Sequence, residues 1–77
     1  MQPNEDDLDH RLLQAHARGD NRALIGLYTE AADMNEARQD IDAACFYLTH
    51  AYVFALDTGA PEARELHRRL KDRGREE

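Results

Sequence analysis

Apolar residues recur along the chain at the spacing of one face of an α-helix, and no stretch alternates apolar with polar residues. The clearest stripe follows positions i, i+3, i+4, i+7 and i+10: Leu24, Leu27, Tyr28, Ala31 and Met34. Weaker stripes with the same period precede and follow it. Together they predict four helices over about residues 6–18, 21–37, 40–57 and 61–73.

The residues between the stripes are those that commonly end and begin helices. Gly19 and Gly59 stand where helices stop, Asp20 can cap the next helix, and Pro61 can open the last one. Either Asp40 or Asp42 suits the start of the third helix. We therefore expect an all-α fold of four antiparallel helices in two helix–turn–helix hairpins, about 6–37 and 40–73. The acidic segment 1–5 is expected to be disordered, and the tail 74–77 to fray.

The third helix is apolar on nearly all sides, which is typical of a buried helix. Its core stripe contains Ile41, Ala44, Cys45, Leu48, Tyr52 and Ala55. Its second face carries large apolar side chains with a histidine among them: Phe46, Tyr47, His50, Val53 and Phe54. Two interpretations stay open, because the first and fourth helices offer only narrow apolar stripes. Either the other helices cover this face, or part of it meets another chain.

A repeat underlies the two hairpins. Leu12 and His16 correspond in position to Leu48 and Tyr52, which follow them by about 36 residues. Helical hairpins of this period are typical of solenoid repeats. The segment Gly19-Asp20-x-x-x-Leu24-x-x-Leu27-Tyr28-x-x-Ala31 resembles the turn and second helix of the tetratricopeptide repeat. Leu48-x-x-Ala51-Tyr52, followed by Gly59 and Ala63, is similar to a second copy.

The tetratricopeptide resemblance covers about residues 8–71. It implies that the first helix of each hairpin lines a concave groove in which peptides bind. Phe46, Tyr47, His50 and Phe54 would then be groove residues.

Length and charge narrow the classes of protein. A chain of 77 residues forms one small domain, which is too short for a cofactor domain plus a substrate domain. A net charge of −6 argues against nucleic-acid or anionic-membrane partners. The chain has one cysteine, no basic and apolar leader at its start, and no apolar run near the roughly 18 residues of a membrane span. We expect a cytoplasmic protein, and the use of Arg over Lys is typical of bacteria with GC-rich genomes.

Candidate catalytic and metal-binding residues form no recognised pattern. The histidines lack the spacing of a ligand pair: His10, His16, His50 and His67. Cys45 lies on the core stripe, and no glycine-rich phosphate loop occurs. The sequence therefore predicts no enzyme activity, no cofactor and no bound metal.

The fourth helix carries a basic stripe at positions i, i+4, i+7 and i+11: Arg64, Arg68, Lys71 and Arg75. One interpretation is a solvated face with local Glu65–Arg69 and Arg68–Asp72 pairs. The other is that Arg64 and Arg68 bind an acidic peptide.

The leading hypothesis is a non-catalytic protein-interaction module, an adaptor or scaffold that binds a protein or peptide through the second face of the third helix. The alternative is a small accessory subunit that packs permanently on the catalytic chain of a larger enzyme. A homo-oligomer through the same face is compatible with both.

Overall fold

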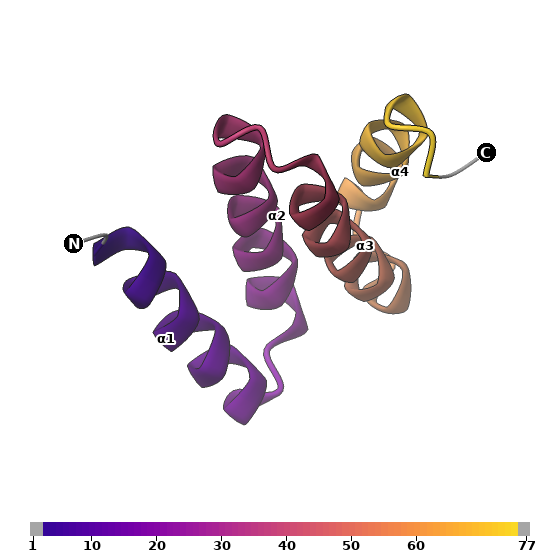
Figure 1. Ribbon diagram of the computed structural model, residues 1–77. Coiled ribbons are helices and arrows are strands. Elements are labelled where there is room, and N and C mark those ends of the chain that lie inside the picture. Colours follow the sequence, from indigo (N-terminus) through magenta and orange to yellow (C-terminus); the bar gives the residue numbers. More distant parts are fainter. Residues whose placement is uncertain (1–2, 76–77) are drawn as a thin grey trace.

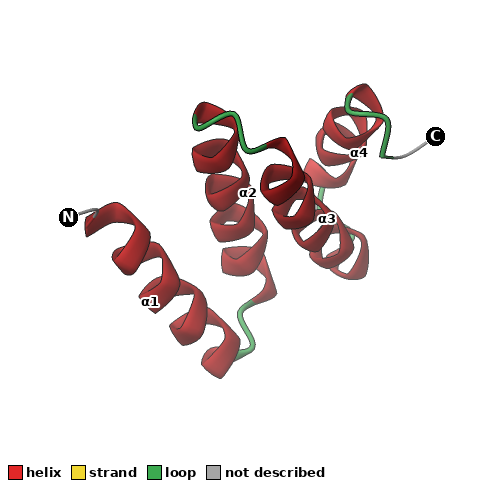
Figure 2. Cartoon of the chain, in the orientation of Figure 1, coloured by secondary structure: helices red, strands yellow, loops and turns green. Residues whose placement is uncertain are grey.

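The computed structural model describes residues 3–75, which form four helices joined by short loops (Figures 1 and 2). They are α1 (Pro3–Arg18), α2 (Asn21–Ala37), α3 (Ile41–Thr58) and α4 (Glu62–Asp72). The described residues contain no strand, so the predicted all-α class is confirmed. None of the four helices is both long and apolar enough to cross a membrane.

The first helix begins earlier than the sequence predicts. Residues 3–5 are helical rather than disordered, whereas residues 1–2 lie outside the described part. Proline is favoured at a first helical position because its fixed φ suits the helix and its missing N–H has no partner there. The acidic residues that follow Pro3 in the sequence suit the positive end of a helix dipole.

The described part of the predicted tail is also held in place. α4 ends at Asp72, and the guanidinium of Arg75 lies 2.6 Å from the Asp42 carboxylate at the start of α3. Residues 76–77 lie outside the described part.

Local chemistry fixes the helix ends as expected. Gly19 and Gly59 adopt left-handed φ values of 65° and 66°, which glycine reaches without a steric penalty. The Asp20 carboxylate accepts a hydrogen bond from Ala23 N at the start of α2. At α3 the cap is Asp40 rather than Asp42, because its side chain accepts from Ala43 N at 3.2 Å.

The backbones of the four helices contact one another only in chain order: α1 with α2, α2 with α3, and α3 with α4 (Figure 1). The contact between α2 and α3 is the most extensive. Small side chains let α3 approach its neighbours closely, since Ala44, Ala51 and Ala55 are fully buried. The main core joins α2, α3 and α4: Ile25, Ala32, Cys45, Leu48, Ala51, Ala55, Ala60, Leu66 and Leu70.

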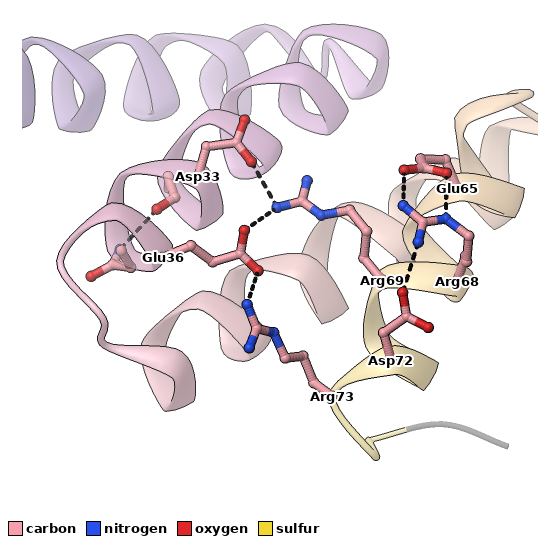
Figure 3. A network of polar contacts seen from close by, with 9 residues as sticks. Asp33, Glu36, Glu65, Arg68, Arg69, Asp72 and Arg73 are labelled. Carbon is pink, nitrogen blue, oxygen red and sulfur yellow. Dashed lines mark hydrogen bonds and ion pairs between the residues drawn. The ribbon is translucent and has the colours of Figure 1, made fainter.

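Ion pairs connect α2 to α4, although their backbones do not touch. The Arg69 guanidinium lies 2.7 Å from Asp33 and 2.8 Å from Glu36, and Arg73 also reaches Glu36 (Figure 3). Helical spacing predicted a local pair of Arg69 with Glu65. The charge of Arg69 does act on Glu65, but the ion pairs of Arg69 are with α2. Only 18% of the Arg69 side chain is exposed, because it points along the protein surface toward α2.

Candidate interaction surface

Tyr28 of α2 is the centre of a group of rings contributed by three helices. Its ring centre lies 5.9 Å from that of His16 in α1. On α3 it lies 6.1 Å from Tyr47, 5.1 Å from His50 and 5.9 Å from Phe54. We call these five residues the ring cluster. His16 also meets Phe54 at 6.1 Å, so the cluster connects α1 to α3 without a backbone contact between them.

Two hydrogen bonds orient the cluster. Tyr28 Oη lies 2.9 Å from His16 Nε2. His50 Nδ1 lies 2.9 Å from the Phe46 carbonyl, which can only accept, so Nδ1 carries the proton. Burial raises the pKa of Tyr28, and the nearby Tyr47 adds to the effect, so the phenol stays neutral at physiological pH. The two hydrogen bonds therefore set the directions of the Tyr28 and His50 rings within the cluster.

The other helices cover part of the second face of α3 and leave part of it exposed, and contact with another chain stays a prediction. Tyr47 and Phe54 pack against the core and are half-buried, as is His50. Phe46 remains 58% exposed and Val53 48% exposed. Phe46 and Val53 are two helical turns apart, so they share an edge of α3, and that edge has no neighbouring helix.

The exposed edge and the ring cluster are continuous. The Phe46 ring centre lies 4.5 Å from that of His50 and 5.3 Å from that of Tyr47. An open hollow of about 250 Å³ lies beside Val53, lined by Thr49, His50, Val53 and Phe54. All five predicted contact residues on α3 thus belong to one surface.

The two predicted contacts on α4 do not join this surface. Arg68 pairs with Glu65 and, at 2.7 Å, with Asp72 on the same helix, as on a solvated helix face (Figure 3). Arg64 is exposed and forms no ion pair with a described residue. Because Arg75 pairs with Asp42, the basic stripe is not a continuous cationic surface.

The sequence pattern did not predict the roles of Tyr28 and His16. It places Tyr28 in the apolar stripe of residues 24–34, and it places His16 in the repeat and among histidines that lack the spacing of a ligand pair. One signal was present: Tyr28 is the only aromatic residue of α2 and falls within the segment that resembles the tetratricopeptide repeat.

The thiol and the candidate metal ligands of the described residues lie apart from the ring cluster, except for His16 and His50. Cys45 is buried, with 3% of its surface exposed. Among the described side chains, those of residues 7–75, no three histidine, cysteine or acidic groups come together as metal ligands would. Comparison with protein-family models, curated proteins and solved structures found no match to this chain.

Proposed function

We propose that the protein is a non-catalytic interaction module that holds a segment of another protein against the ring cluster. The observation that carries this proposal is the exposure of Phe46 and Val53 beside rings that contact one another and are held by hydrogen bonds. Large apolar side chains at the edge of a fixed aromatic surface are typical of protein-binding sites. Fixed rings also lower the entropic cost of binding, because fewer side chains must be ordered.

The order of helix contacts supports an adaptor of the solenoid type. In such arrays each unit packs on its neighbours, and one face stays available for a partner. The resemblance to the tetratricopeptide repeat stays a prediction, as does a cytoplasmic location. Arg64 stays a predicted second contact for an acidic group of the partner.

The proposed module is tested by changing Phe46 to Asp. A charge at this position would disrupt an apolar contact while leaving the core unchanged. Leu13→Asp is the matched control, because Leu13 is 70% exposed on α1 and lies outside the ring cluster. Affinity purification with mass measurement should recover a partner with the unchanged protein and with Leu13→Asp, but not with Phe46→Asp. Equal recovery by all three proteins would contradict the proposal.

The alternative is an accessory subunit, and the exposure of Phe46, Val53 and Leu56 along one helix favours it. A permanent interface would bury all three side chains. In that case the partner should co-purify at fixed stoichiometry, and the isolated chain should bind a hydrophobic dye and self-associate. An adaptor should bind reversibly and remain monomeric alone.

A further inference from the structure

Among the described side chains, the ion pairs leave few carboxylates unpaired. Among side chains from residue 7 to residue 75, most acidic groups contact an arginine. The exceptions, which form no ion pair with a described residue, are Asp9, Asp40, Asp57 and Glu62. Asp40 caps α3, and Glu62 lies in the first turn of α4.

Asp9 and Asp57 lie at opposite ends of the ring cluster. Asp9 lines a small hollow with Tyr47, and it is two helical turns from His16 on the same side of α1. Arg38 also lines that hollow and has a partner of its own. Asp57 is exposed and follows Phe54 by three residues, which places it one turn beyond the rings on α3.

We propose that the occupant of the ring cluster is a short cationic segment with an apolar centre. This inference rests on the proposed function and names the class of partner. Aromatic faces attract lysine and arginine side chains, and the attraction is strongest where water is excluded. A carboxylate at each end of the rings would pair with a basic residue at each end of the segment. The exposed Phe46 and Val53 would contact its apolar centre.

The length of α3 beside the rings sets a minimum spacing for the basic residues, because Asp9 lies on α1 and shares a hollow with Tyr47. Tyr47 and Asp57 are about 15 Å apart along α3, given the rise of about 1.5 Å per helical residue. An extended peptide covers that length in about five residues. A second copy of this chain fits less well, because each copy carries a net charge of −6 and the two would repel.

The test uses three labelled peptides of about six residues, long enough to span the cluster. Each has Leu-Phe at its centre and arginine, glutamine or glutamate at both ends. Fluorescence anisotropy gives the affinities, and ring resonances of Tyr28 and Phe54 report where the peptides bind. We expect the arginine peptide to bind about fivefold tighter than the glutamine peptide at low ionic strength, and the advantage to vanish near 0.5 M salt.

Variants connect the preference to the two carboxylates. Asp9→Asn combined with Asp57→Asn should lower the affinity of the arginine peptide to that of the glutamine peptide. The control is Glu62→Gln, which removes a carboxylate that likewise forms no described ion pair, and it should leave the affinity unchanged. Circular dichroism checks that each variant is folded.

Other outcomes would overturn the inference. Equal binding of all three peptides would support the interaction surface but contradict its preference for a cationic segment. Binding of none, with Phe46→Asp still losing its protein partner, would overturn the inference while the proposed function stands. A concentration-dependent dimer that shifts the same ring resonances would assign the surface to a second copy.

Discussion

The hydroxyl of Tyr28 lies 2.9 Å from Nε2 of His16, and this hydrogen bond connects α2 to α1 within the ring cluster. Without it, α1 would meet the cluster only through ring contacts. The bond therefore helps fix the position of the first helix relative to the third.

Replacing Tyr28 by Phe should weaken the fold by the value of this one hydrogen bond. The ring contacts persist, so the free energy of unfolding should fall by about 0.5–1.5 kcal/mol. Tyr28→Ala also removes the ring contacts and should cost about 2–4 kcal/mol. Urea denaturation followed by circular dichroism measures both. Tyr52→Phe is the control, because the Tyr52 ring faces His67 on α4 at 5.5 Å and forms no described hydrogen bond. An equal loss in the control would contradict the role given to Tyr28.

The network around Glu36 makes stability depend on pH. Burial alone would raise the pKa of Glu36, but hydrogen bonds and charge from Arg69 and Arg73 outweigh it and hold the pKa below its ordinary 4.5. The ionised carboxylate therefore contributes its full stability above pH 4.5, and the contribution is lost as the pH falls through the folded-state pKa.

Glu36→Gln should lower the free energy of unfolding by about 1 kcal/mol at pH 7, since this network is partly buried. The difference from the unchanged protein should shrink below pH 4.5. Urea denaturation between pH 7 and pH 3 tests this expectation. For the control Glu62→Gln, the difference in free energy of unfolding from the unchanged protein should not shrink as the pH falls. A difference for Glu36→Gln that stays constant with pH would contradict the role given to Glu36.

Replacing Gly26 or Gly59 by alanine should change the stability of the protein in opposite directions. Gly26 lies inside α2 and Gly59 ends α3, and a Cβ at either position would meet no atom within 4 Å. Gly26→Ala should stabilise the protein by about 0.5–1 kcal/mol, because alanine favours a helix interior. Gly59→Ala should cost about 1 kcal/mol, because φ is +66°. Thermal unfolding measures both, and equal shifts would be inconsistent with this explanation.

The Cys45 thiol should react slowly in the folded protein. Only 3% of its surface is exposed, although Cys45 lines an open hollow with Phe46 and Arg75. A bulky thiol reagent should therefore react mainly when the helices open locally or globally. Labelling with a chromogenic disulfide should be at least about 100-fold slower in buffer than in 6 M urea, because only a small fraction of the folded molecules is open at any time. Rapid labelling in buffer would show that the α3 core opens readily.

The helix boundaries could be predicted because their causes are local. Gly19, Gly59 and Asp20 act through backbone conformation or one nearby N–H, and those effects are visible in a few neighbouring residues. The early start of α1 at Pro3 differs from the predicted disordered segment, because acidic residues suit the first turn of a helix as well as solvated chain.

The candidate site could be predicted only on one helix. The rings of α3 lie close together in the sequence. Tyr28 and His16 reach them only because α1 and α2 pack beside α3 in the folded chain. Arg69 illustrates the same limit. Helical spacing permits an ion pair between Arg69 and Glu65. In the fold Arg69 instead pairs with Asp33 of α2, and Arg68 pairs with Glu65.

Packing in chain order has a consequence for how the molecule opens. α1 is terminal among the described helices, and its backbone contacts only α2, so detaching it costs less than unfolding the whole chain. Its amide hydrogens should therefore exchange with solvent sooner than those of α3. A ligand that contacts both His16 and Phe54 would hold α1 against α3. Its binding would therefore slow the exchange of the α1 amide hydrogens, and that slowing would report occupancy of the ring cluster.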